Sequence, residues 1–222
     1  MGTKKIYHGR EVMQLIDGFY IPDGDLPKHH NAESVIKHDK ILNAKVLEYT
    51  KHRRHMVDVG GNVGRWSVDF AKDFQTVSAF EPAPYHIECF EKNCKEYPNI
   101  KLYPYGLSNA NKKGNLEVAV AEHLGSTRVI PASDGNIELK TLDEHNFTDV
   151  DVLKVDVEGL EIDVLQGAEQ TIRRCKPIIV IERCVFNSER FGLDKMASHN
   201  ELDKQGYKRL FKITRDCIYG PK

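Results

Sequence analysis

Two carboxylates, Asp156 and Glu158, lie in the stretch LKVDVEGLEIDVLQGAE, where an apolar run changes into a helical pattern. Short acidic residues at such a junction often cap a helix, because they accept hydrogen bonds from free backbone N–H groups and complement the helix dipole. A carboxylate pair at the end of a strand can also act as a general base or bind a divalent cation. The stretch alone leaves capping and chemistry open.

The glycine-rich stretch VDVGGNVGRW is the second group that could do chemistry. Its glycines, Gly60, Gly61 and Gly64, permit a sharp turn and a close approach of a ligand to the backbone. Glu81 ends the next apolar run about 20 residues later, where an acidic side chain can accept hydrogen bonds from ribose hydroxyls. Together the two features predict a site for a cofactor that contains adenosine.

The residues around the glycines indicate which cofactor this is. A dinucleotide site requires G-x-G-x-x-G, whereas here Asp58 stands inside the strand and Asn62 replaces the middle glycine. S-adenosylmethionine has no phosphate to bind, and its ammonium and sulfonium groups attract a carboxylate such as that of Asp58. The pattern therefore favours S-adenosylmethionine over a nicotinamide dinucleotide.

Apolar runs that alternate with helical patterns must position these residues. Helices are predicted over residues 34–50, from Arg65, over residues 85–97 and near residues 162–174. Strands are predicted in HMVDV, TVSAFEP, IKLYPYGLS, DVLKVDV and PIIVIE, which indicates a doubly wound parallel sheet that binds ligands beyond its carboxyl edge. Residues 109–136 are expected to be a polar, glycine-rich excursion, and YKRLFKI and RDCIYG a closing antiparallel strand pair.

Four stretches, VDVGGNVGRWS, AFEPAP, YGLSN and LKVDVEGLEIDVLQGA, resemble the FkbM family of S-adenosylmethionine-dependent methyltransferases. The resemblance runs in the same order from about Met56 to Glu182, and its D-x-E-G-x-E block is the most specific part. It implies an α/β class I methyltransferase fold (Rossmann-like), a doubly wound, mostly parallel sheet of seven strands with an antiparallel C-terminal pair. Family members largely methylate hydroxyl oxygens on sugars, polyketides and other small molecules. No clear resemblance covers residues 1–30 or 186–222.

The resemblance also implies where the cofactor binds. It suggests Asp58, Gly60 and Asn62 around the methionine part and Glu81 on the ribose. Leu107 and Ser108 are expected beside the adenine, and Ser126 corresponds more loosely. The complete expected set of cofactor-binding residues is Asp58, Gly60, Gly61, Asn62, Gly64, Glu81, Leu107, Ser108, Ser126 and Asp156.

Asp156 and Glu158 are the expected catalytic residues, because class I methyltransferases bring the substrate to the donor methyl group after the fourth strand. Methylation of a hydroxyl is an in-line displacement that requires removal of the hydroxyl proton, and a carboxylate with a raised pKa could be the base. Alternatively, the pair holds a divalent cation that lowers the pKa of the hydroxyl. The sequence does not decide between them. Further candidates are Glu161, Glu182, His86 and His123, with the histidines ranked below the carboxylates.

Composition excludes several other classes of function. Lys and Arg (32) nearly balance Asp and Glu (33), which does not favour nucleic acid or an anionic membrane as a partner. No secretory signal and no apolar run of roughly 18 residues are present, so a soluble, cytoplasmic protein is expected. Five cysteines without C-x-x-C spacing predict free thiols, and the histidines lack the spacing of metal ligands.

The 222 residues are expected to form one methyltransferase domain. Its parts would be a helical or loop extension (1–50), a core with the cofactor motifs (56–182) and a C-terminal helix and strand pair (183–222). The predicted function is S-adenosylmethionine-dependent O-methylation of a sugar, glycan or other small molecule. A non-catalytic cofactor-binding module and a nicotinamide-dependent oxidoreductase are the alternatives. The sequence specifies neither the acceptor nor the oligomeric state.

Overall fold

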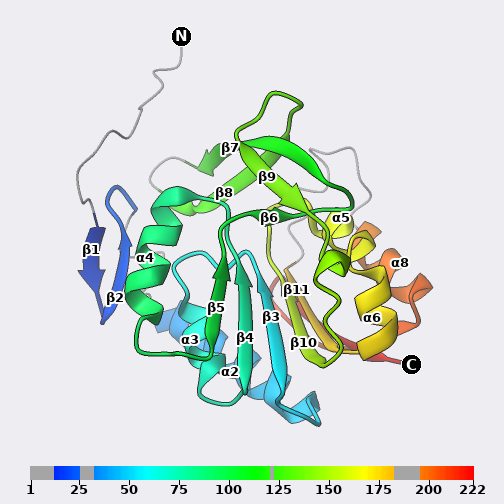
Figure 1. The fold of residues 1–222 in the computed structure, drawn as a ribbon. Coiled ribbons are helices and arrows are strands. Elements are labelled where there is room, and N and C mark those ends of the chain that lie inside the picture. Colours follow the sequence, from blue (N-terminus) through cyan, green and yellow to red (C-terminus); the bar gives the residue numbers. More distant parts are fainter. Residues whose placement is uncertain (1–12, 26–32, 121–122, 183–195) are drawn as a thin grey trace.

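The computed structural model describes residues 13–25, 33–120, 123–182 and 196–222. Its centre is a seven-stranded sheet of order β12-β13-β11-β10-β3-β4-β5 (Figure 1). The five strands from β5 to β11 are parallel, and β13 is antiparallel to both of its neighbours. The predicted doubly wound fold and its antiparallel closing pair are therefore confirmed. The strands are β3 (His55–Val59), β4 (Thr76–Phe80), β5 (Ile100–Tyr103), β10 (Val150–Val155), β11 (Ile178–Glu182), β12 (Tyr207–Ile213) and β13 (Asp216–Pro221).

Helices cover both faces of this sheet, which is why its central strands are apolar on both sides. Val57, Leu153 and Ile179 pack on one face with α5 (Glu161–Gln166), α6 (Glu169–Cys175) and α8 (Ala197–Lys204). The alternate residues Met56 and Val152 pack on the other face with α2 (Glu33–Tyr49) and α3 (Arg65–Ala71). The alternation of side chains along each strand thus builds two cores.

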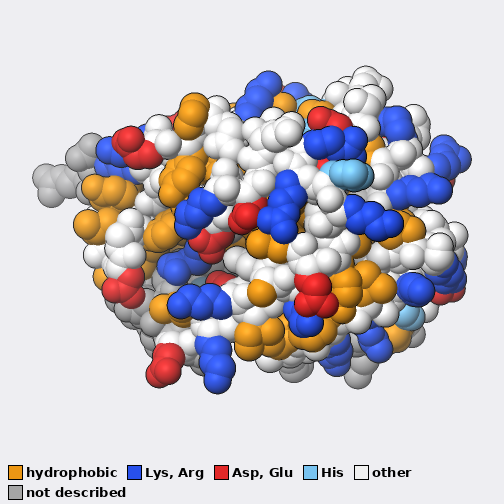
Figure 2. Space-filling view, turned by 90° about the horizontal axis from the view of Figure 1, so that it is seen from below, with side chains coloured by type: hydrophobic (Ala, Val, Ile, Leu, Met, Phe, Trp, Pro, Cys, Tyr) orange, Lys and Arg blue, Asp and Glu red, His pale blue; other side chains and the backbone are white. Residues whose placement is uncertain are grey.

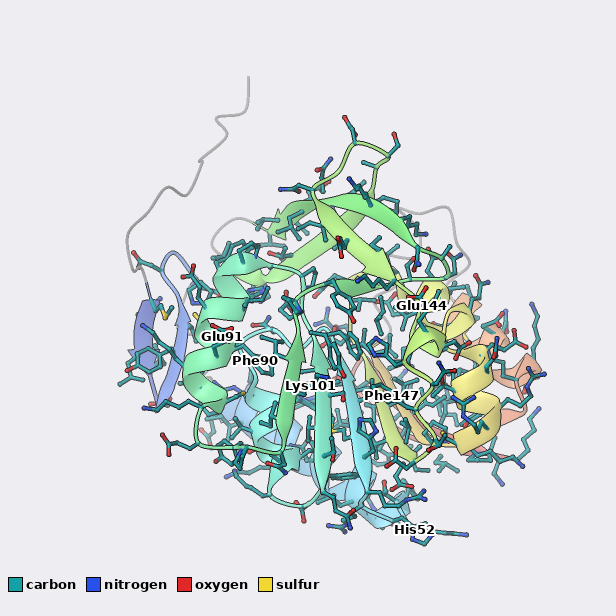
Figure 3. The ribbon with its side chains drawn as sticks, in the orientation of Figure 1. His52, Phe90, Glu91, Lys101, Glu144 and Phe147 are labelled. Carbon is teal, nitrogen blue, oxygen red and sulfur yellow. The ribbon has the colours of Figure 1, made fainter. Side chains whose placement is uncertain are left out.

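Helix α4 (Pro84–Cys94) begins with a proline at its first position, where a missing N–H costs nothing. Its Phe90 lies toward β4 and β5 and packs with Val68 and Ala79 (Figure 3). The helix predicted near residues 162–174 is divided into α5 and α6 at Gly167. A Cβ at Gly167 would lie 1.9 Å from the carbonyl oxygen of Ser108, so only glycine permits this close approach.

The polar, glycine-rich excursion over residues 109–136 forms strands, which were not predicted. β7 (Lys112–Val120) and β8 (His123–Pro131) form an antiparallel hairpin, and β9 (Ile137–Lys140) and β6 (Gly106–Leu107) complete a sheet of order β6-β9-β7-β8. Figure 1 shows this second sheet across the carboxyl ends of the parallel strands. The predicted strand IKLYPYGLS divides into β5 and β6, because Pro104 between them has no N–H for a strand ladder.

The N-terminal extension contains the expected helix, α2, but it also forms a strand pair that was not expected. β1 (Met13–Ile16) and β2 (Phe19–Pro22) form a hairpin whose turn, Asp17-Gly18, has positive φ at both residues. An Asp-Gly pair is the usual signal for such a turn. The backbone N–H of Tyr20 donates to Asn93 Oδ1 at 2.8 Å, which attaches the hairpin to α4. Residues 1–12, 26–32 and 183–195 of the predicted terminal segments lie outside the described residues.

Three expectations from composition can be compared with the described residues. Acidic and basic side chains are interspersed on the face opposite the second sheet (Figure 2). Among the described helices, none is long and apolar enough to cross a membrane. Cys89, Cys94, Cys175 and Cys217 are free thiols, as predicted, and Cys184 lies outside the described residues.

Candidate active site

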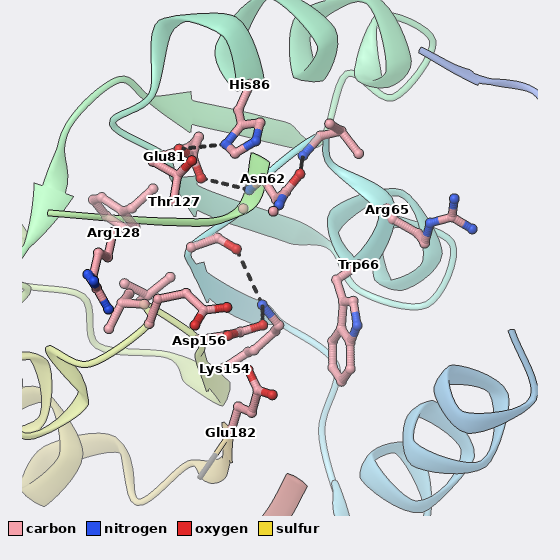
Figure 4. A pocket seen from close by; sticks show the side chains of 18 of the residues that line it. Asn62, Arg65, Trp66, Glu81, His86, Thr127, Arg128, Lys154, Asp156 and Glu182 are labelled. Atoms are coloured by element: carbon pink, nitrogen blue, oxygen red, sulfur yellow. Dashed lines mark hydrogen bonds and ion pairs between the residues drawn. The ribbon is translucent and has the colours of Figure 1, made fainter. Parts of the chain in front are cut away.

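A cavity of about 660 Å³ lies beyond the carboxyl ends of β3, β4 and β10, and β8 contributes to its wall. Figure 4 shows side chains from these elements around it. Seven of the predicted site residues line the cavity, whereas Asp58, Gly64, Ser108 and Ser126 do not. The seven lining residues are Gly60, Gly61, Asn62, Glu81, Leu107, Asp156 and Glu158.

Asp58 lies behind the cavity wall. Its carboxylate is fully buried, and it accepts a hydrogen bond from Ser67 Oγ at 2.7 Å. Lys154 Nζ is 3.3 Å from Asp58 Oδ1 and 3.5 Å from Asp156 Oδ2. Burial opposes the charge of Lys154, but the two carboxylates raise its pKa above the usual range. Asp58 is therefore neutralised within the protein, by a lysine that itself lines the cavity.

The other three predicted residues outside the wall have structural contacts. Ser108 is buried, and its hydroxyl donates to Asp163 Oδ2 at 3.1 Å. Ser126 Oγ donates to the His123 carbonyl at 2.6 Å and stabilises the β7–β8 hairpin. Gly64 has a φ of 88° directly before α3, and a Cβ there would lie 2.6 Å from Cys94 Sγ. Their motif positions thus serve the fold around the cavity.

The glycine turn after β3 brings backbone to the cavity surface. Gly60 has a φ of 83°, and a Cβ there would lie 1.8 Å from the Asp156 carbonyl oxygen. Asn62 follows in the left-handed region, and its backbone N–H donates to Glu81 Oε2 at 2.8 Å. The Ala83 backbone N–H donates to Glu81 Oε1 at 2.8 Å, so both oxygens of Glu81 are held beside the turn.

His86 supplies a buried polar atom in the same part of the cavity. Its Nδ1 lies 3.4 Å from Glu81 Oε1 (Figure 4). Its Nε2 is buried and has no hydrogen-bond partner. A buried nitrogen without a partner is costly, and a ligand hydroxyl in this part of the cavity would satisfy it. The glycine turn, Glu81 and His86 therefore fit a ribose-containing cofactor.

Three carboxylates form a compact acidic cluster in the cavity wall: Asp156, Glu158 and Glu182, each offering an oxygen within 4.8 Å of the others. Burial and the neighbouring Asp156 raise the pKa of Glu182 well above its usual range, although Arg215, 2.8 Å away, opposes this shift. Helix α5 begins at Glu161 with Leu160 as its N-cap residue. Neither Asp156 nor Glu158 occupies that position, so N-capping does not explain the pair.

Glu161 serves its own loop. Its side chain is buried, and its Oε1 accepts the backbone N–H of Gly159 at 2.9 Å. Burial raises the pKa of Glu161 to about 7, against the opposing effect of these backbone hydrogen bonds. The loop needs this support because Glu158 and Gly159 both have positive φ. Glu161 therefore holds the turn that presents Glu158.

The raised pKa of Glu161 predicts a pH-dependent stability. The native protein binds more protons than the unfolded chain between about pH 4.5 and pH 7, so the free energy of unfolding should fall as the pH rises through this window. Glu161→Gln should reduce this fall by the contribution of Glu161 and stabilise the protein at pH 8 by on the order of 1 kcal/mol or more. Urea unfolding near pH 5 and near pH 8 measures the effect. The exposed residue Glu169 supplies the control, and equal pH dependence in Glu161→Gln and Glu169→Gln would contradict the prediction.

The rest of the cavity wall was not predicted. Arg65, Trp66 and Lys154 line it, as do Thr127 and Arg128 from the second sheet, beside the predicted candidate His123. Only Lys154 had a usable signal, a cation inside the otherwise apolar run DVLKVDV. Helix α2 and the turn between β12 and β13 contribute a further side, where His38 Nε2 lies 3.2 Å from Asp216 Oδ2. Burial raises the pKa of Asp216 to about 6.

Comparisons with known proteins agree with this geometry. The family model described as Methyltransferase FkbM domain matches residues 58–209. "Methyltransferase 1" of Beauveria bassiana is 23% identical over 159 residues, which cover 58% of this chain and 64% of that protein. "Hexuronic acid methyltransferase AglP" of Haloferax volcanii is 27% identical over 142 residues, which cover 61% of this chain and 58% of that protein. Each match thus spans less than two thirds of the relative's own length.

Solved structures share the fold. The methyltransferase FkbM from Methylobacillus flagellatus KT has a TM-score of 0.52 at 18% identity, covering 76% of this chain and 43% of that chain. The N-methyltransferase NodS from Bradyrhizobium japonicum WM9, in complex with S-adenosylhomocysteine, has a TM-score of 0.52 at 10% identity, covering 87% and 88% of the two chains. At these identities the likeness shows the fold alone.

Proposed function

Because the chain belongs to the methyltransferase FkbM family, we propose that it transfers a methyl group from S-adenosylmethionine to a hydroxyl of a sugar, glycan or other small molecule. The observation that carries the proposal is a single cavity lined both by the Gly60–Asn62 turn with Glu81 and by the acidic cluster. The hexuronic acid methyltransferase among the relatives supports a sugar acceptor. A methyl-transfer screen over free sugars, uronic acids and lipid-linked glycans tests the acceptor class.

The residues around the glycine turn would hold the cofactor. Glu81 would accept hydrogen bonds from the ribose hydroxyls, and Gly60 and Gly61 would let the ligand approach the backbone closely. Leu107, which is buried and lines the cavity, would offer an apolar surface to the adenine. When bound, S-adenosylmethionine supplies an electrophilic methyl group on a sulfonium. All other steps depend on groups of the protein.

Asp156 is the proposed base for the acceptor hydroxyl. Lys154 Nζ lies 3.5 Å from its Oδ2, and burial and the neighbouring Asp156 raise the pKa of Glu182, which favours a proton on that carboxyl. A positioned carboxylate that removes the proton as the oxygen attacks contributes about a hundredfold or more to such a reaction. The alternative role, a divalent cation held by the acidic cluster, would lower the hydroxyl pKa instead.

The cofactor assignment predicts a strong effect of Glu81. Glu81→Ala should weaken binding of S-adenosylmethionine and S-adenosylhomocysteine by more than about tenfold, because a charge-assisted hydrogen-bond acceptor is lost. The affinity of Glu81→Gln should lie between those of the wild type and Glu81→Ala, since the glutamine keeps one hydrogen-bond acceptor beside the Asn62 N–H. Isothermal titration calorimetry measures the affinities, with Glu88→Ala on the exposed side of α4 as the control.

Two results would contradict the cofactor assignment. One is NAD binding without a response to S-adenosylmethionine, which would favour the oxidoreductase alternative. The other is an unchanged affinity for S-adenosylhomocysteine in Glu81→Ala, provided that thermal melting shows the variant to be folded.

A further inference from the structure

Arg65 differs from the other cationic side chains of the cavity wall. Lys154 lies between two carboxylates, Arg215 contacts Glu182, and Arg128 contacts Glu117. Arg65 has no ion pair with any residue that the structure describes, and its Nη2 is buried without a hydrogen-bond partner. Its guanidinium instead lies 4.9 Å from the centre of the Phe19 ring.

This arrangement is unfavourable unless a ligand completes it. A buried N–H of a charged group without an acceptor loses its hydration and gains no replacement. Asp39 on α2 is near enough to sense the charge of Arg65, but its carboxylate contacts His38 Nδ1 at 3.3 Å. The Phe19 ring meanwhile restrains the guanidinium through a cation–π contact. Arg65 is thus oriented, charged and short of an acceptor.

The guanidinium fork is suited to a planar or tetrahedral anion. Two parallel N–H groups can donate to the two oxygens of a carboxylate, or to those of a sulfate or phosphate. Figure 4 shows Arg65 pointing away from Glu81, Asp156 and Glu182. An anion at Arg65 would therefore lie apart from the proposed ribose site and from the proposed reacting hydroxyl, in a part of the same cavity that Trp66 also lines.

We propose that Arg65 binds a negatively charged group of the methyl acceptor, a carboxylate, sulfate or phosphate distant from the hydroxyl that is methylated. This inference rests on the proposed function and narrows its acceptor class to anionic molecules. The cofactor's own carboxylate is the other source of the same chemistry, and the experiment separates the two sources.

The test uses two matched probes, methyl β-D-glucuronoside and methyl β-D-glucoside. They differ only at C6, which is a carboxylate in the first probe and a hydroxymethyl group in the second. Binding of each to the full chain is measured by NMR titration in the presence of S-adenosylhomocysteine. The wild type should prefer the glucuronoside by at least about tenfold, as expected for a charge-assisted bidentate contact. Arg65→Gln should reduce this preference nearly to parity, and the exposed control Arg173→Gln should preserve it.

Two further measurements test whether the change in preference comes from the lost contact of Arg65 with the acceptor. Arg65→Lys retains the positive charge and the aliphatic side chain but not the guanidinium group, so it should keep part of the preference for the glucuronoside. If Arg65→Gln does not fold, Arg65→Lys takes its place in the test. Affinity for S-adenosylhomocysteine should stay within about twofold of wild type in Arg65→Gln, because the proposed contact is with the acceptor.

Several outcomes would overturn the inference. The proposed contact between Arg65 and the methyl acceptor would be contradicted if the wild type showed no preference for the glucuronoside, or if the preference persisted in Arg65→Gln. A selective loss of S-adenosylhomocysteine affinity in Arg65→Gln, with 5′-methylthioadenosine unaffected, would assign Arg65 to the cofactor's carboxylate instead. A wild type that does not bind S-adenosylhomocysteine would refute the proposed function itself, whereas cofactor binding without a probe preference would refute only the role of Arg65.

Discussion

Asp156→Asn should reduce the rate of methyl transfer by about a hundredfold or more while the fold and the affinity for S-adenosylhomocysteine remain near those of the wild type. Asn has the shape of Asp but cannot take a proton from the acceptor hydroxyl. The backbone contacts of residue 156 do not depend on its side chain, since its N–H donates to the Val59 carbonyl at 3.0 Å. Thermal melting, cofactor titration and single-turnover methyl transfer measure the three properties separately.

Glu158→Gln is the matched comparison, because it neutralises another member of the same acidic cluster. If Asp156 acts as the base, Glu158→Gln should be much milder than Asp156→Asn. If the cluster holds a divalent cation, both variants should be impaired, and a chelator should inactivate the wild type until magnesium or manganese is added. Full activity in both variants would refute a catalytic role for the pair.

Lys154→Met should lower the free energy of unfolding by about 3–5 kcal/mol, the usual scale for breaking a buried ion pair. Asp58 is completely buried, and its Oδ1 has no hydrogen bond besides the ion pair with Lys154. Removing the lysine leaves this carboxylate uncompensated in the core. Urea unfolding near neutral pH measures the loss.

Two comparisons identify charge as the cause. The double variant Asp58→Asn with Lys154→Met should recover much of the lost stability, since no unpaired charge remains. Lys112→Met removes a lysine that pairs with Asp163 at 2.6 Å, but the Lys112 side chain is 29% exposed, so its loss should cost only about 1 kcal/mol or less. If Lys112→Met and Lys154→Met lowered the free energy of unfolding equally, burial of the Lys154 ion pairs would make no difference to stability, and the prediction would be wrong.

Local patterns in the sequence were sufficient for the main sheet. Apolar runs such as HMVDV and DVLKVDV, separated by helical periodicity, predicted the parallel strands and the edge at which Gly60, Glu81 and Asp156 meet. These features depend on periodicity and on turn residues only a few positions apart, so one sequence contains them. The Asp17-Gly18 turn was equally local, and the hairpin there was overlooked.

The second sheet required tertiary information. β7 and β8 are adjacent in sequence, but β6 joins the sheet only by pairing with β9, which is distant along the chain. Pairing of this kind depends on what covers each strand, and no local pattern specifies it. The contributions of β8, α2 and the β12–β13 turn to the cavity were unpredictable for the same reason.

The contrast is sharpest at Asp58. Its type and position indicated a carboxylate near the cofactor, and the sequence placed it correctly inside the strand that leads into the glycine turn. Only the tertiary structure puts Lys154 directly beside it, because β10 pairs with β3 in the register that matches Lys154 with Asp58. Residues paired across adjacent parallel strands project from the same face of the sheet. Sequence therefore determined which charged groups lie at the ends of the strands, and strand register decided which of them neutralise one another.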